Sequence, residues 1–186
     1  MTSFAFGNPH ARVHVYVEKA PPVENVFGHA DDLPLYTSLQ KGHIKALGEA
    51  GGNGWRKVFN VYAKLMFALP ESSPFYPHGY KTWQAFRDQA LLQAESNTAL
   101  HFGHANPLRS AQTQHSDPKH LALHIIAGRT HAHKLGLSGS CVWINNEFAK
   151  HPTLPILICP YFDYRQLSNS KIDVLTKLMT INDCNE

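Results

Sequence analysis

The sequence predicts an α/β protein, a three-layer sandwich with a mainly parallel central sheet of about four strands. Two observations lead to this prediction. Short strand-like segments recur near residues 12, 98, 123 and 156. Helix-like segments lie between the first two of these and again after the third and the fourth. Strands that alternate with helices in this way typically run parallel, because a parallel connection needs a crossover of a dozen or more residues.

The clearest predicted strand spans residues 12–18. Two sets of side chains alternate there, with Val13, Val15 and Val17 in one set and Arg12, His14, Tyr16 and Glu18 in the other. A period of two places such sets on opposite faces of a sheet. The segment Ala20-Pro-Pro22 ends this strand, and residues 22–34 are predicted to be a loop.

Three helices are predicted before the second strand. Residues 39–50 have a weak amphipathic pattern, which a glycine cluster ends. Residues 55–69 have a strong pattern, because apolar side chains recur at three- and four-residue spacing until Pro70. Residues 82–95 form the third predicted helix, with Thr82 as its N-cap.

The second half of the chain is predicted to continue with strands, turns and helices. Residues 98–103 form a short strand, and a long polar loop follows at residues 104–119. Residues 123–127 are interpreted as a buried strand, although a helix also fits this apolar run. Gly128 then begins a turn into a short helix that Gly136 closes.

The last predicted strand lies within residues 152–159, and its apolar run Ile156–Cys159 indicates that it is buried. A polar loop follows from Pro160, and a helix is predicted over residues 171–179. Residues 140–144 could form one further short strand.

The composition limits the class of protein. With 186 residues, of which 43% are hydrophobic and 17% charged, the chain is predicted to form one globular domain over residues 1–186. A formal net charge of +3 permits a nucleic-acid partner only if the basic residues are clustered. No apolar run is long enough to cross a bilayer, and residues 1–9 lack the features of a secretory signal. We therefore expect a soluble, cytoplasmic protein without a membrane partner. The three cysteines do not indicate a disulfide framework.

Histidine is unusually frequent, with 13 residues, and three pairs have close spacing: His101 and His104, His120 and His124, and His131 and His133. None has the glutamate of a zinc-protease helix or the spacing of a structural zinc site, so no metal site is predicted. No phosphate-binding or dinucleotide-binding loop is present either, so no cofactor is predicted. A metal-dependent hydrolase that uses His101, His104 and either His131 or His133 stays an alternative.

Polar and aromatic residues are concentrated in the loop after the last strand. Arg165 can bind a carboxylate or phosphate, Asp163 can accept hydrogen bonds, and Tyr161 can stack on a planar ligand. Ligand sites of α/β proteins lie at the carboxyl ends of such strands. The structural alternative is that Asp163, Ser168 or Asn169 caps the following helix and that Arg165 pairs with Asp163.

Two segments of the C-terminal half carry a resemblance to a known family. Residues 125–136 form a strand, a glycine turn and a helix, and residues 156–169 form a strand that ends in a polar loop. In order and spacing, residues 98–180 remotely resemble the uracil-DNA glycosylase superfamily. The segment Leu100–Asn106 corresponds to the place where that family holds an asparagine that recognises the base.

The resemblance implies a fold and a class of ligand. Pro160-Tyr-Phe-Asp163 stands where the family has a His-Pro-Ser motif, and only Glu18 and Pro21 are present in place of the family's first motif. The resemblance therefore implies binding of a nucleobase, nucleotide or DNA, without implying glycosylase activity. The predicted ligand-binding residues are Tyr161, Asp163, Arg165, Asn169, His101 and Asn106. A non-catalytic interaction protein on the same fold is the other alternative.

Overall fold

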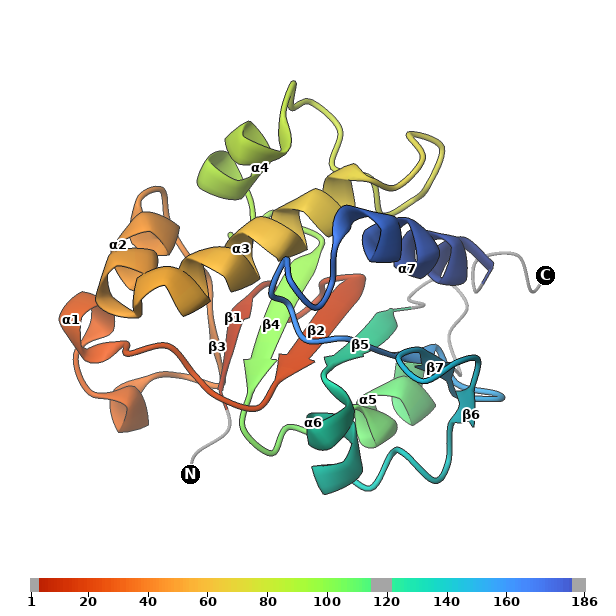
Figure 1. Ribbon diagram of the computed structural model, residues 1–186. Helices are drawn as coiled ribbons and strands as arrows, with labels where there is room; N and C mark the ends of the chain where they lie inside the picture. Colours follow the sequence, from red (N-terminus) through yellow and green to blue (C-terminus); the bar gives the residue numbers. More distant parts are fainter. Residues whose placement is uncertain (1–3, 115–121, 182–186) are drawn as a thin grey trace.

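The computed structural model describes residues 4–114 and 122–181 (Figure 1). Within these residues, one mixed, mostly parallel sheet contains eight strands in the order β3-β1-β4-β2-β5-β8-β7-β6. The α/β class is as predicted, but the sheet has eight strands where the sequence predicted about four. The strands are β1 Ala5–Gly7, β2 Val13–Val17, β3 Tyr36–Thr37, β4 Thr98–Phe102, β5 Leu123–Ala127, β6 Val142–Trp143, β7 Ala149–Lys150 and β8 Ile156–Cys159.

The four predicted strands form the parallel centre of the sheet, in the order β4-β2-β5-β8. Residues 123–127 are a strand, which decides against the helix that the same apolar run allows. Every residue of β2 is buried, including His14 and Tyr16. The two alternating sets of side chains do face opposite sides of the sheet, but the set with His14 and Tyr16 is buried as well. A central parallel strand has helices packed on both faces.

The additional strands β1, β3, β6 and β7 are two or three residues long. Such segments are too short to show a period of two in the sequence. Their pairing partners define them instead: β1 pairs antiparallel with β4 and parallel with β3, whereas β7 pairs antiparallel with β8 and β6. Of these four strands, the sequence indicated only β6, within residues 140–144.

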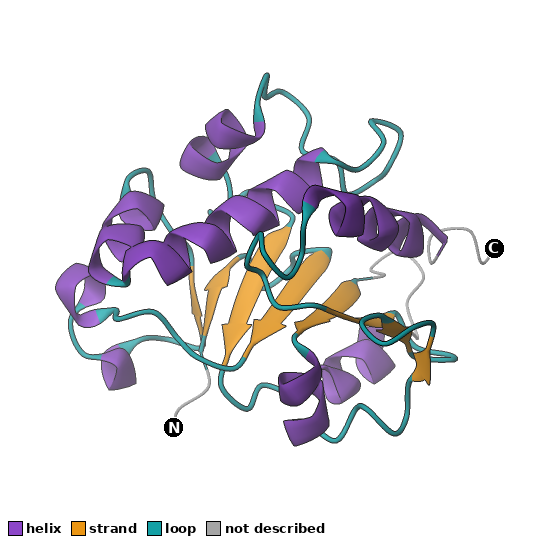
Figure 2. Ribbon diagram, viewed as in Figure 1, coloured by secondary structure: helices purple, strands orange, loops and turns teal. Residues whose placement is uncertain are grey.

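Helices flank the sheet on both faces (Figure 2). The first face is covered by α2, α3, α4 and α7, whose buried residues belong to one hydrophobic core with Val13, Val15 and Val17. The second face is covered by α5 and α6, which contribute Ala111 and Ala132 to a smaller core. The helices are α1 Glu24–Phe27, the 3-10 helix η1 Ala30–Asp32, α2 His43–Ala50, α3 Gly52–Phe67, α4 Trp83–Gln89, α5 Pro107–Gln114, α6 Arg129–Lys134 and α7 Asn169–Ile181.

The predicted loop at residues 104–119 contains a helix, α5, at Pro107–Gln114. The side chain of Asn106 begins it, because its Oδ1 accepts a hydrogen bond from the backbone N–H of Leu108 at 2.9 Å. The segment has few apolar residues, so its helical period was not visible in the sequence. Residues 115–119 lie outside the described part of the chain.

The long helix α3 is tied directly to the sheet. Tyr62 is fully buried, and its hydroxyl lies 3.0 Å from the carbonyl oxygen of Val13 and 3.1 Å from that of Ala99. Thr82 caps α4 as predicted, since its hydroxyl accepts a hydrogen bond from the N–H of Ala85. None of the helices in the described ranges is long and apolar enough to span a membrane.

Candidate ligand-binding cleft

The carboxyl ends of the four parallel strands lie at one edge of the sheet. Among these four strands, the one that follows β2 in the chain is β4, which lies on one side of β2. The next, β5, lies on the other side of β2. The strand order therefore reverses between β2 and β5. In open α/β sheets, ligands bind in the crevice outside the carboxyl ends of the strands at such a reversal.

A cavity of about 530 Å³ opens beside this reversal, at the carboxyl ends of β2 and β4, and we call it the edge cleft. A volume of this size is within the range of small-molecule sites. Its lining comes from the ends of β2 and β4, from η1, from α6 and from the N-terminal segment, and includes Phe4, Glu18, Lys19, Asp31, Phe102, His104, His131 and Lys134.

His131 is the most unusual residue of the edge cleft. It lies on α6, it is 4% exposed, and neither of its ring nitrogens has a hydrogen-bond partner within the described residues. Burial lowers its pKa, and the opposing effect of the nearby Glu18 is smaller. The ring is therefore neutral at pH 7, with one nitrogen able to donate a hydrogen bond and the other able to accept one. A buried polar group without a partner costs about 1–3 kcal/mol, which a ligand that bonds to it would recover.

Charged side chains lie beside His131. Lys134 donates a hydrogen bond to Oε1 of Glu18, and both side chains are about half exposed. This hydrogen bond lowers the pKa of Glu18, so its carboxyl group is ionised at neutral pH. Lys19 adds a further positive charge to the lining. Asp31 also lines the cleft, so the two lysines are balanced by two carboxylates and the rim offers charged donors and acceptors side by side.

Aromatic residues form the apolar wall of the edge cleft. The ring centroids of Phe4 and Phe102 are 4.9 Å apart, and Phe102 also contacts Phe6 edge to face. Phe4 and Phe102 both line the cleft, and both are almost fully buried. Flat aromatic or apolar ligand rings pack favourably against such a wall.

One comparison assigns the chain to a family. The model of a family of unknown function, DUF6942, matches residues 4–180. The chain belongs to this family. No curated protein and no solved structure matches it. The resemblance to uracil-DNA glycosylases therefore has no support from a relative.

This DUF6942 protein uses the predicted loop residues Asp163 and Arg165 for an ion pair. Nε and Nη2 of Arg165 donate to the two carboxylate oxygens of Asp163, at 3.3 and 3.1 Å. Nζ of Lys57, from α3, donates to Oδ2 of the same carboxylate at 3.1 Å. Arg165, followed by Lys57, holds the pKa of Asp163 well below its usual range. The pairing of Arg165 with Asp163 that the sequence allowed as an alternative is confirmed.

We expect Asp163→Asn to lower the free energy of unfolding by about 2 kcal/mol, because it leaves the largely buried Lys57 without its carboxylate. Arg165→Ala is the matched control. The Arg165 side chain is 70% exposed, so its removal should have a much smaller effect. Urea unfolding of both variants at pH 7 checks this expectation, and equal losses would contradict it.

The other predicted residues lie in different surroundings. His101 belongs to a buried cluster on β2, β4 and β5, in which its Nε2 lies 2.9 Å from Nδ1 of His14. Asn106 caps α5, and its Nδ2 donates to the carbonyl of Leu135. Tyr161 lies against the Gly128 turn, and Asn169 begins α7.

The six predicted residues therefore do not meet in one cavity. Of these six, Asp163 and Arg165 bond to each other, and none is among the residues that line the edge cleft. Their part in ligand binding stays a prediction. The sequence had singled out Glu18 because it stands in place of the glycosylase family's first motif, and His131 because it is closely spaced with His133. The position of Glu18, immediately after a strand, was the signal that could have placed it at this edge.

The histidines do not gather into a metal centre within the described residues, where no group of three His, Cys, Asp or Glu side chains could hold a metal ion. His104 and His131 line the edge cleft, whereas His133 is exposed and His101 lies in the buried cluster. His120 lies outside the described residues. The two histidines of the cleft are thus available for hydrogen bonding to a ligand.

Proposed function

We propose that this protein binds a small planar ligand of the nucleobase or nucleotide class in the edge cleft. The observation that carries the proposal is His131, a neutral, almost fully buried imidazole in the lining of a cavity, with both ring nitrogens unpaired within the described residues. The edge of a nucleobase presents donors and acceptors side by side, which matches a ring that offers one of each.

The rest of the lining supports the same class of ligand. The rings of Phe4 and Phe102 offer an apolar wall for a base, and Lys19, together with Lys134 beside its partner Glu18, offers cations for a phosphate. A nucleotide combines these two requirements in one molecule. The sequence resemblance to uracil-DNA glycosylases points to the same chemical class.

The charges of the edge cleft favour binding over catalysis. A general base works best when its pKa lies near the operating pH. Lys134 lowers the pKa of Glu18 instead, and burial lowers that of His131. Both groups are thus better suited to holding a ligand than to accepting a proton from it.

Isothermal titration calorimetry with the five common nucleobases and their nucleoside monophosphates tests the proposal. We expect at least one of them to bind, and we expect His131→Ala to weaken that binding at least tenfold because it removes both hydrogen bonds. The matched control is His133→Ala, which removes an exposed histidine from the same helix. It should leave the affinity unchanged.

Two further variants sharpen the result. Lys134→Ala should weaken binding of monophosphates more than of free bases, because it removes a cation from the rim. Arg165→Ala should have no effect if the edge cleft is the site. Absence of binding by any ligand of the panel, or an unchanged affinity in His131→Ala, would rule the proposal out. Release of free uracil from a uracil-containing oligonucleotide would extend the proposal to catalysis.

A further inference from the structure

A second surface, remote from His131, follows the outer side of α3. Three adjoining hollows lie along this helix and share lining residues: Arg56 and Asn60 belong to the first and the second, and Lys64 belongs to the second and the third. We call this continuous surface the α3 groove. With 16 residues, α3 is about 24 Å long, so the groove is an extended channel and not a compact pocket.

The α3 groove carries most of the net positive charge of the chain, which is +3. Six basic and three acidic side chains line it. Asp163, which pairs with Lys57, is a fourth carboxylate beside them, so the groove has a local excess of two positive charges. The basic residues are therefore clustered, which is the condition under which a weakly basic protein can bind a polyanion. The six are Lys41, Lys45, Arg56, Lys57, Lys64 and Arg87.

Three of these cations have no carboxylate partner within the described residues: Lys41, Arg56 and Lys64. Arg56 donates from Nε to the carbonyl of Gly48 at 3.2 Å, a bond that leaves both Nη groups available. Of the other three basic residues, Lys45 pairs with Glu49, Lys57 with Asp163 and Arg87 with Asp88. Nearby carboxylates thus neutralise some cations of the groove and leave a row of unpaired ones.

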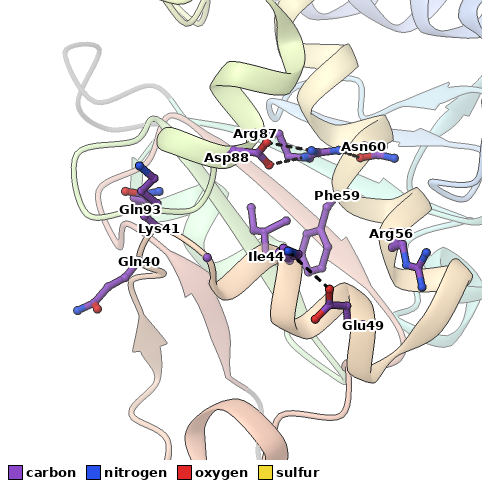
Figure 3. Close-up of a pocket in the computed structure, with 12 residues that line it drawn as sticks. Gln40, Lys41, Ile44, Glu49, Arg56, Phe59, Asn60, Arg87, Asp88 and Gln93 are labelled. Atoms are coloured by element: carbon purple, nitrogen blue, oxygen red, sulfur yellow. Dashed lines mark hydrogen bonds and ion pairs between the residues drawn. The ribbon is translucent and has the colours of Figure 1, made fainter.

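Two of the three hollows also contain an aromatic side chain that is at least partly exposed. In the first, Phe59 and Ile44 lie between Lys41 on one side and Arg56 on the other (Figure 3), but both are buried in the core, so they form only the apolar floor of this hollow. In the second, Nζ of Lys57 lies 4.8 Å from the ring centroid of Tyr164, a residue that is 56% exposed. In the third, Nζ of Lys64 and Cζ of Arg87 lie 5.1 and 5.5 Å from the ring centroid of Trp83.

We propose that the α3 groove binds single-stranded nucleic acid. Proteins that bind single strands combine a basic channel, which follows the phosphates, with aromatic rings on which successive bases stack. The groove has both features, because its cations lie beside the accessible rings of Tyr164 and Trp83. The bases of a duplex are already stacked and paired, so they cannot use rings such as that of Tyr164. The groove is therefore matched to a single strand and not to a double helix.

Fluorescence anisotropy with a labelled oligothymidylate of about 16 nucleotides tests the proposal. If Lys41, Arg56 and Lys64 each neutralise one phosphate, log K should fall with log salt concentration with a slope of about −2. Binding should then weaken roughly 20-fold between about 50 and 200 mM NaCl. Lys64→Ala should reduce the magnitude of this slope by about 0.7. The matched control is Lys150→Ala, which removes the same charge from an exposed position of β7 and should leave the slope unchanged.

The aromatic contribution is measured separately. Tyr164→Ala should weaken binding about tenfold, whereas Tyr164→Phe, which keeps the ring, should bind like the original protein. His131→Ala should not alter this binding, and Lys64→Ala should not alter binding of a nucleobase in the edge cleft, so the two sites can fail independently. Circular dichroism confirms that each variant is folded.

Four results would overturn the proposal. The first is no binding at about 50 mM NaCl. The second is an equal loss in Lys64→Ala and Lys150→Ala, which would show an effect of net charge alone. The third is an unchanged affinity in Tyr164→Ala together with equally tight binding of heparin, which would show a surface for any polyanion. The fourth is tighter binding of a duplex of the same length.

Discussion

Lowering the pH from 7 to 4 should destabilise the folded protein by about 3 kcal/mol through His14 alone. His14, His101 and His124 lie on three adjacent strands and are almost fully buried. Burial lowers the pKa of His14 to about 4 and that of His101 to about 3, and it moves the pKa of His124 in the same direction.

The direction of the effect follows from which state binds more protons. In the unfolded chain, a histidine takes up a proton near pH 6.5, whereas these three stay neutral in the folded protein until the pH is much lower. Between these values the unfolded state binds more protons, so stability falls as the pH falls. The full contribution is present above about pH 6.5 and is lost progressively down to the folded-state pKa values.

Burial keeps the cluster neutral, and its hydrogen bonds are compatible with neutral rings. Nε2 of His14 lies 2.7 Å from the carbonyl oxygen of Ala11, so it carries a proton, and Nδ1 of His14 accepts from Nε2 of His101 at 2.9 Å. Tyr16 stacks on His101, and its hydroxyl lies 2.9 Å from Nδ1 of His124. Neutral rings satisfy each of these hydrogen bonds, and a charged ring would lose solvation without gaining an acidic partner from these contacts.

Urea unfolding at pH 7, 6, 5 and 4 measures this dependence. His14→Leu should reduce the slope of stability against pH between about 4 and 6.5, whatever it costs at pH 7. The matched control is His78→Gln, which removes an exposed histidine and should leave the slope unchanged. A slope that is equal in the original protein and in His14→Leu would contradict the role of the cluster.

Gly7→Ala should lower the free energy of unfolding by about 3 kcal/mol or more. Gly7 is the last residue of β1, opposite Ala99 of β4, and has a φ of +110°. A Cβ atom at this position would lie 2.3 Å from the carbonyl oxygen of Thr98. The substitution therefore adds a clash with the backbone to the strain of a positive φ.

Gly79→Ala separates these two effects. Gly79 has a φ of +90°, but a Cβ atom added there would have no neighbouring atom within 4 Å, so its replacement should cost only about 1–2 kcal/mol. Thermal and urea unfolding of both variants tests the difference. Equal losses would mean that β1 shifts freely and that its pairing with β4 is not tight.

The central strands and the long helix could be predicted because their signals are local. The alternation of residues 12–18, the apolar runs that became β5 and β8, and the amphipathic pattern of α3 are each visible in a short window. Thr82 was identifiable as an N-cap for the same reason. By contrast, β1, β3 and β7 escaped prediction, since two or three residues have no period and pair only because a neighbouring strand is already in place.

The candidate site was less predictable than the fold. The loop after β8 is rich in groups that bind ligands, but Asp163 uses its carboxylate to hold Arg165 and Lys57. Whether a polar side chain is free or already paired depends on its neighbours in space, and Lys57 is 106 residues away in the chain. His131 could not be distinguished in the sequence from an exposed histidine such as His133. Only the structure shows that it is buried without a hydrogen-bond partner among the described residues.

By itself, the sequence determined that this is an α/β protein with a parallel centre, because residues that repeat with a fixed period also bury a fixed face. Only the tertiary structure decided what lies together at the ends of those strands. The edge cleft joins Phe4, Glu18, Phe102 and His131, and the α3 groove joins α2, α3, α4 and the loop after β8. Local periodicity specifies which face of an element is buried but not which distant residue it meets, so both surfaces could be found only once the chain was folded.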